Sequence, residues 1–222
     1  MSGGTVGGGG LRQEQAAATR KKLLESAQRL FGEKGYKGTP VREINRSVNL
    51  GDGLIYHYFP GGKKEIFQAI VEENVKQIMQ RLDYSSRIGE FVDTPLKKLL
   101  ETVYLSFIQV VDSHLDILRI LFRENEVRGL VSKEQMMHLV GKRDPWFPKV
   151  LRKKMERGEL RQMDCEMAAR SLNAILMNHV MIKVFCIGPS NLELAEERHR
   201  LVDYQASMWQ ADDWGETTEE RL

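Results

Sequence analysis

The residues best suited to chemistry lie between positions 39 and 63, where the sequence collects side chains that can bind phosphate. Tyr56 and His57 offer a phenol hydroxyl and an imidazole. Lys63 follows a pair of glycines at the start of a predicted helix, so a cation and the positive end of a helix dipole coincide there. A single Lys or Arg is usually only a solvated charge. The prediction of phosphate binding therefore depends on the whole set at this spacing.

Two further groups in this stretch can approach the edges of bases. Arg42 follows Pro40 at the start of a short predicted helix, from which it can reach the DNA backbone or a guanine. The run Asp52-Gly53-Leu54 has short side chains where a second helix begins, which lets the backbone approach a major groove. Asp52 is unusual, because phosphates repel a carboxylate. It either turns away or accepts a hydrogen bond from a cytosine amine.

Two short helices separated by a tight turn must position these side chains. Thr39 and Pro40 form a helix start, with Thr as N-cap and Pro at the first helical position, and this helix is expected to reach about residue 47. Asn49 then occupies a turn position that requires positive φ, which Asn tolerates well. The second helix begins over 51–53, and its Ile55 and Phe59 close a small core. This arrangement predicts a helix-turn-helix.

Apolar periodicity predicts helices along the rest of the chain, and no segment shows the alternation of a strand. They are expected at about 13–34, 63–82, 94–112, 114–123, 132–157 with a kink at Pro145 and Pro148, 165–187 and 192–210. The predicted fold is all-α, with an N-terminal three-helix helix-turn-helix domain and a C-terminal helical bundle. The predicted division is a disordered tail at 1–12, domains at 13–62 and 63–210, and an acidic tail at 211–222.

The predicted helix over 165–187 is apolar around most of its circumference. Polar residues inside it, such as Arg170 and Lys183, argue against a membrane span. We therefore predict that one face packs on its own domain and another on a partner subunit, with 192–210 also in the interface. A central helix in a larger monomer is the alternative.

The distribution of charge and the two cysteines limit the class of protein. Residues 1–64 hold 11 Lys and Arg against 5 Asp and Glu, and the remaining residues hold 22 against 26. A basic N-terminal part and an acidic remainder fit a nucleic-acid-binding module attached to a soluble domain. A chance unevenness of charge is the alternative. Cys165 and Cys186 fall on one helix roughly 30 Å apart, too far to pair with each other. With no secretory signal evident, the expected location is cytoplasmic.

The stretch from about Thr19 to Phe67 resembles the N-terminal DNA-binding domain of TetR-family transcriptional regulators. The resemblance is carried by GYKGTPVREI and by Ile55-Tyr56-His57-Tyr58-Phe59 followed by Lys63. The stretch Gly158-Glu159-Leu160-Arg161 is also similar to the family pattern. The remainder resembles the family only in architecture, which implies that the C-terminal helical bundle is a ligand-binding and dimerisation domain. The resemblance implies a homodimeric repressor that binds a palindromic operator in double-stranded DNA and is released by a small-molecule effector. It implies no cofactor, no metal and no membrane association.

Site residues follow from the resemblance position by position. Phosphate contacts are implied for Thr39, Val41, Tyr56, His57 and Lys63. Proximity to base edges is implied for Arg42, Asp52, Gly53 and Leu54. Asp52 departs from the family, where a Lys or a neutral polar residue is common, so no sequence preference of the family is carried over to this chain.

An effector pocket is expected among the helices between residues 94 and 187. Large apolar side chains there are the candidates for its lining: Tyr104, Phe107, Phe122, Trp146, Phe147, Met177 and Met181. Ordinary core packing is the alternative for each of them.

An enzyme, a protein-interaction module and an activator are the alternatives to a repressor. The five histidines are scattered, with no metal-ligand spacing, nucleophile elbow or phosphate-cradling loop, so no catalytic or metal-binding residue is predicted and the protein is not expected to be an enzyme. A helical protein-interaction module without DNA binding is a second alternative. Within the DNA-binding interpretation, an activator is the alternative to a repressor.

Overall fold

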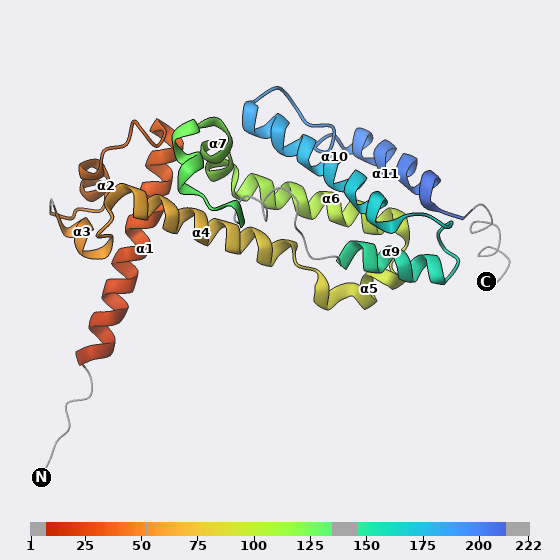
Figure 1. Ribbon diagram of the computed structural model, residues 1–222, viewed down its shortest axis with the longest axis horizontal. Coiled ribbons are helices and arrows are strands. Elements are labelled where there is room, and N and C mark those ends of the chain that lie inside the picture. Colours follow the sequence, from red (N-terminus) through yellow and green to blue (C-terminus); the bar gives the residue numbers. More distant parts are fainter. Residues whose placement is uncertain (1–7, 52, 135–145, 212–222) are drawn as a thin grey trace, which may run out of the picture. The chain divides into compact units, whose positions relative to one another are not determined.

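The computed structural model describes residues 8–51, 53–134 and 146–211 (Figure 1). Their regular structure is helical, and an isolated bridge between Leu160 and Gln210 is the β-type pairing found among them. This confirms the predicted all-α fold. The chain divides into two compact units, one of residues 1–74 with 116–133 and one of residues 75–115 with 134–222.

The first unit is built around a helix-turn-helix. Its elements are α1 (Gly8–Lys34), α2 (Val41–Ser47), α3 (Leu54–Tyr58), the first part of α4 (Gly62–Leu82), α7 (Leu115–Arg123) from Asp116 onward, and the 3-10 segment η2 (Asn125–Leu130). Its core is made of fully buried apolar side chains, among them Leu23, Ala27, Phe31, Ile44, Ile55, Phe59, Ile66 and Phe67. The predicted closure by Ile55 and Phe59 is confirmed.

The division between the units differs from the expected boundary at 62/63. The first turns of α4 belong to the first unit because Ile66 and Phe67 are fully buried there, with the Phe67 ring centroid 6.0 Å from that of Phe31. Asn74 still reaches back to α1, donating to the Gln28 side chain over 3.0 Å. The same unit also contains residues 116–133, and the apolar periodicity of the sequence does not predict that this later segment packs there.

Helix α1 begins at Gly8, earlier than the predicted start near residue 13. Part of the expected tail over 1–12 is therefore helical, even though glycine is a poor helix former. Nucleating a helix fixes several residues for the first hydrogen bond, whereas extending an existing helix adds one hydrogen bond for each residue fixed. A helix as long as α1 can therefore extend toward the N-terminus into glycine residues. Residues 1–7 of that expected tail and residues 212–222 of the acidic tail lie outside the described residues.

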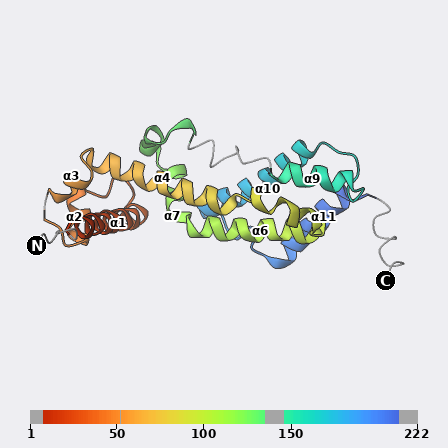
Figure 2. The same cartoon turned by 90° about the horizontal axis from the view of Figure 1, so that it is seen from below.

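The second unit is a helical bundle. Besides the end of α4, it contains η1 (Ser85–Arg87), α5 (Ile88–Asp93), α6 (Leu96–Ser113), α9 (Trp146–Glu156), α10 (Cys165–Phe185) and α11 (Ala195–Trp209). Helix α5 packs on α9, α9 packs on α10, and α6 packs on both α10 and α11 (Figures 1 and 2). Inside the bundle, the buried Tyr104 hydroxyl of α6 donates to the Gln205 side chain of α11.

The helix ends in this unit follow local chemistry. The Asp164 carboxylate accepts the backbone N–H groups of Glu166 at 2.9 Å and Met167 at 3.1 Å, which caps the N-terminus of α10. Helix α10 ends at Phe185 because Cys186 adopts φ 54°, a left-handed conformation that the helix cannot continue through. Of the helix predicted over 132–157, α9 covers 146–156, with Pro148 in its first turn; residues 135–145 lie outside the described residues.

Candidate nucleic-acid interface and ligand cavity

The turn between α2 and α3 has the geometry that the sequence predicts. Asn49 adopts φ 57°, and its N–H donates to the Arg46 carbonyl over 3.1 Å. Helix α3 begins at Leu54, later than expected, because Gly53 before it takes φ 99° and so cannot belong to the helix. The glycine therefore forms the entry to α3. Asp52, a predicted base-reading residue, lies outside the described residues.

The predicted DNA-facing side chains of α2 and α3 lie on the surface. Arg42, Leu54 and His57 are exposed, and Tyr56 is 52 % exposed. Gly62, at φ 62°, explains the position of Tyr56: a Cβ atom on Gly62 would lie 3.2 Å from a ring carbon of Tyr56. A glycine at the start of α4 therefore lets the Tyr56 ring lie against that helix N-terminus.

Lys63 is held beside this surface by the turn between α1 and α2. Its ammonium lies 4.4 Å from the ring centroid of Tyr36 and 3.4 Å from the carbonyl of Lys37. A cation over an aromatic ring is attracted by the negative ring face. The half-buried Lys63 thus has a defined position in the first turn of α4.

The position of Thr39 differs from the one that the predicted phosphate contact requires. Its side chain is fully buried, and its hydroxyl lies 2.9 Å from the Gly35 carbonyl and 3.1 Å from the Leu30 carbonyl. Pro40, not Thr39, occupies the N-cap of α2. The Thr39 hydroxyl therefore joins the end of α1 to the turn that follows and is not available to a phosphate from this position. Val41 is half-buried at the first position of α2.

One cation near this surface is missing from the predicted set. The Arg20 guanidinium of α1 lies 4.9 Å from the ring centroid of Phe59, the C-cap residue of α3. The side chain is exposed and so lies at the edge of the candidate interface. Its place in the run Arg20-Lys21-Lys22 was the available sequence signal, but periodicity alone did not connect it with α3.

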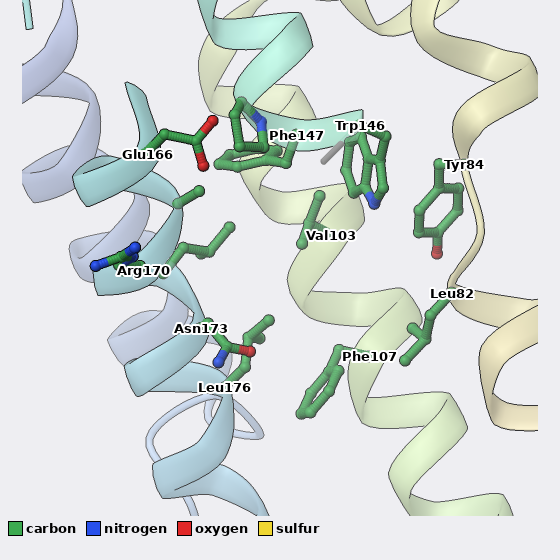
Figure 3. Close-up of a pocket in the computed structure, with 13 residues that line it drawn as sticks. Leu82, Tyr84, Val103, Phe107, Trp146, Phe147, Glu166, Arg170, Asn173 and Leu176 are labelled. Carbon is green, nitrogen blue, oxygen red and sulfur yellow. The ribbon is translucent and has the colours of Figure 1, made fainter. Parts of the chain in front are cut away.

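The second unit contains a cavity of about 270 Å³. Figure 3 shows side chains of α6, α9 and α10 around it. Its lining consists of Leu82, Tyr84, Val103, Phe107, Trp146, Phe147, Pro148, Glu166, Ala169, Arg170, Leu172, Asn173 and Leu176. Of the residues predicted to line an effector pocket, Phe107, Trp146 and Phe147 border this cavity.

Four predicted lining residues lie elsewhere. Tyr104 is buried against α11, and burial raises the pKa of its phenol. Met177 and Met181 are half-buried on α10 and do not border the cavity, and Phe122 is on α7 in the first unit. The prediction favoured large apolar side chains and so missed the polar face that α10 contributes, with Glu166, Arg170 and Asn173.

The described residues contain neither a metal-binding cluster nor a membrane-spanning helix. Their His, Cys, Asp and Glu side chains form no group of three or more placed to hold a metal ion. Among the helices of that same part of the chain, none combines the length and the hydropathy of a membrane span.

Comparison with known proteins identifies the family. Residues 23–70 match the profile of bacterial regulatory proteins of the tetR family, and residues 98–211 match the C-terminal domain of AefR-like transcriptional repressors. The HTH-type transcriptional repressor NicS of Pseudomonas putida is 26 % identical over 130 residues, which are 56 % of this chain and 57 % of NicS. The matched region thus spans a little over half of that relative.

Solved structures share the fold. A TetR-family transcriptional regulator from Mesorhizobium loti has 17 % identity and a TM-score of 0.63, covering 88 % of this chain and 98 % of that one. The transcriptional regulator FadR from Bacillus subtilis, solved in complex with stearoyl-CoA, has 17 % identity and a TM-score of 0.57, covering 85 % and 98 %. These relatives are regulators of transcription, the class of protein that the sequence predicts. The chain, with its helix-turn-helix and its matching C-terminal region, belongs to the TetR family of bacterial regulatory proteins.

Proposed function

We propose that the protein is a homodimeric repressor of transcription in the cytoplasm. Its paired helix-turn-helix units bind a palindromic operator in double-stranded DNA, and a small molecule in the cavity of the second unit releases it. The repressor names of NicS and of the AefR-like C-terminal domain support the direction of control. A two-fold symmetric dimer presents two equal reading helices, which suits a palindrome.

The observation that carries the proposal is the exposed face of the helix-turn-helix. Arg42 and Tyr56 extend from two different helices, and Lys63 is fixed at the N-terminus of a third. Phosphate contacts place a protein on the duplex, and base contacts give it specificity. We assign Tyr56, His57 and Lys63 to phosphates and Arg42, Gly53 and Leu54 to the vicinity of base edges.

The outer faces of α10 and α11 support dimerisation through 165–187 and 192–210. Met167 of α10 is 56 % exposed and Phe185 is 44 % exposed, while Tyr204 of α11 is 62 % exposed. Scattered apolar residues on a surface are normal, but two consecutive helices that both expose large apolar side chains favour an interface. A second copy of this chain is the partner that we infer.

The cavity supports the effector part of the proposal. It lies among the helices of the second unit and is lined by aromatic side chains together with a few polar ones, which is typical of small-molecule sites. FadR, which shares the fold, was solved with stearoyl-CoA, so a helical domain of this kind can hold a ligand. The ligand of FadR is not assigned to this chain.

DNA binding can be tested by fluorescence anisotropy with a labelled duplex from the region upstream of the protein's own gene. We expect salt-sensitive, saturable binding by the wild-type dimer. Arg42→Gln should bind at least tenfold more weakly, since one charge-assisted hydrogen bond is lost in each subunit. Arg29→Gln is the matched control, because Arg29 is exposed on α1 and pairs with Glu33 over 3.0 Å. Absence of salt-sensitive binding to this and to selected duplex sequences would contradict the proposal.

A further inference from the structure

The N-terminal half of α1 extends beyond the packed part of the first unit. Residues 10–18 are all exposed, Thr19 is half-buried, and Leu23 is the first buried residue of the helix. Figure 1 shows these first turns of α1 projecting past α2 and α3. The match to the tetR-family profile also begins at residue 23, so residues 10–22, the α1 extension, precede the matched region. The packing of the first unit therefore leaves the α1 extension open to a partner.

The composition of the α1 extension fits a polyanionic partner. It contains four cations against one carboxylate, that of Glu14. The cations are Arg12, Arg20, Lys21 and Lys22. Its large apolar side chain is Leu11, which is 62 % exposed, and one leucine offers too little area for a hydrophobic partner. The excess of positive charge repels a second copy of the same segment and attracts phosphates.

The side of α1 that packs in the core continues into the α1 extension. Counting back from the buried Leu23 in steps of four, three and four residues leads to Thr19, Ala16 and Arg12. Positions at these spacings share one side of a helix. Helix α1 packs on α2, and its core side faces the helix-turn-helix. Arg12 therefore lies on the side of α1 that carries the candidate DNA interface.

Arg20 connects the α1 extension with that interface. Its guanidinium lies 4.9 Å from the ring centroid of Phe59, the C-cap residue of α3. Arg12 lies eight residues earlier, which is about 12 Å along the helix axis at about 1.5 Å per residue. Phosphates follow one another at about 3.4 Å along a DNA strand, so this distance corresponds to about three or four phosphates. Arg12 can thus reach phosphates beyond those next to α3.

We propose that the α1 extension is a second DNA-contacting element, in which Arg12 binds backbone phosphates that flank the segment covered by α2 and α3. The continuity with the helix-turn-helix and the positive charge of the segment support DNA as its partner. Such contacts raise the affinity and its salt dependence but do not read the sequence. This inference rests on the proposed DNA binding of the helix-turn-helix and adds a separate contact to it.

Fluorescence anisotropy of the full-length protein with a selected operator, shortened stepwise from both ends, can test this contact. The affinity of the wild-type protein should fall in two stages, first when the flanking phosphates are removed and then when the helix-turn-helix loses its own contacts. Arg12→Gln should lack the first stage. On the longest duplex, it should also reduce the magnitude of the slope of log affinity against log salt by about 1.8, because each of two subunits loses a contact worth about 0.9.

Lys21→Gln is the matched control. Lys21 follows Arg12 by nine residues, or about two and a half helical turns, and so lies on the opposite side of the α1 extension. Its ion pair with Glu25, at 3.8 Å, is exposed and contributes little to stability. Lys21→Gln and the charge-retaining Arg12→Lys should both keep the wild-type slope. Equal losses in Arg12→Gln and Lys21→Gln would show a general effect of charge and would contradict an oriented contact.

The shortest duplexes separate this inference from the proposed function. If they bind and the wild-type affinity falls in a single stage, the contact of the α1 extension is wrong while operator binding stands. If no duplex binds, both proposals fail. If Arg12→Gln instead weakens self-association in sedimentation equilibrium without DNA, the α1 extension contacts a second copy of the chain, which overturns the inference.

Discussion

The Glu124 carboxylate accepts the backbone N–H of Tyr36 through both oxygens, each at 2.9 Å, across 88 positions of sequence. This contact joins the end of α7 to the turn between α1 and α2. Gly35 makes room for it, because a Cβ atom there would lie 2.8 Å from a Glu124 oxygen. The Lys63 ammonium packs on the Tyr36 ring. Because Glu124 holds Tyr36, it acts as a positioning residue for the candidate DNA interface.

Glu124→Ala should destabilise the first unit and weaken DNA binding. The Tyr36 N–H would lose its acceptor, which costs about 1–3 kcal/mol when the group stays shielded from water. Hydrogen exchange at the Tyr36 amide should become faster, and the affinity for DNA should fall several-fold as Lys63 loses its support. Glu72→Ala, a change of an exposed carboxylate on α4, should alter neither quantity. Unchanged exchange at Tyr36 would argue against the positioning role.

Asn49 should tolerate glycine but not a β-branched residue. At φ 57° a side chain with Cβ costs roughly 1–2 kcal/mol, and Asn lowers this cost by local hydrogen bonding, while Gly avoids it. We expect Asn49→Val to lower the free energy of unfolding by about that amount and Asn49→Gly to leave it nearly unchanged. Urea denaturation of the three proteins measures the difference. Equal stability of the Val and Gly variants would contradict the assigned turn.

Lys63→Gln should change the salt dependence of DNA binding. Each phosphate contact contributes about 0.9 to the slope of log affinity against log salt, so two subunits that each lose one contact should reduce its magnitude by about 1.8. Anisotropy titrations over a range of salt concentrations give the slope directly. Lys76→Gln, at an exposed position of α4 well beyond its N-terminus, serves as the control. A weaker complex with the wild-type slope would place Lys63 in a structural role only.

The buried ion pair of the second unit should be sensitive to removal of one partner. The fully buried Lys154 ammonium donates to Glu159 at 2.7 Å and to the Val92 carbonyl at 2.9 Å. Lys154→Met leaves both acceptors without this donor and should cost about 3–5 kcal/mol. The double variant Lys154→Met/Glu159→Gln should recover part of the loss. Lys153→Met, its exposed neighbour, should change the urea midpoint little, and a similar effect of both Lys variants would contradict the assignment.

Stability should decrease in mild acid because of His179. The imidazole is fully buried between α10 and Phe107 of α6, and neither ring nitrogen has a hydrogen-bond partner in the described structure. Burial lowers its pKa below 6.5, against the opposing effect of Glu193 and Asp112 and with a smaller lowering by Lys183. The unfolded chain therefore binds a proton near pH 6.5 that the folded chain does not, so the free energy of unfolding falls as the pH drops below that value.

Urea denaturation of His179→Leu between pH 7.5 and 5 should show a smaller loss of stability than the wild type. His114 contributes a loss of the same sign in both proteins, because burial lowers its pKa too. The exposed His199 provides the control as His199→Gln. A His179→Leu variant with the full wild-type dependence on pH would exclude His179 as a source.

Interactions between residues close in sequence were sufficient to predict much of the structure of the first unit. The apolar spacing of Ile55 and Phe59 and the positive φ of Asn49 depend on neighbours a few residues away, and the sequence predicts both correctly. The motif around Tyr56 and His57 likewise identified the family, because a helix-turn-helix is specified by contiguous residues.

The packing of the helices decided the rest. Thr39 has the sequence position of an N-cap, but its side chain is buried and its hydroxyl lies within hydrogen-bond distance of the Leu30 and Gly35 carbonyls. The cavity combines an aromatic wall from residues 84 and 146–147 with a polar stripe from α10, and amphipathic periodicity cannot say which helix faces are neighbours. The sequence by itself therefore determined the helices and the family, through local propensity and motif. Only the tertiary structure decided which buried groups pair and where the cavity lies, because these depend on how the helices pack.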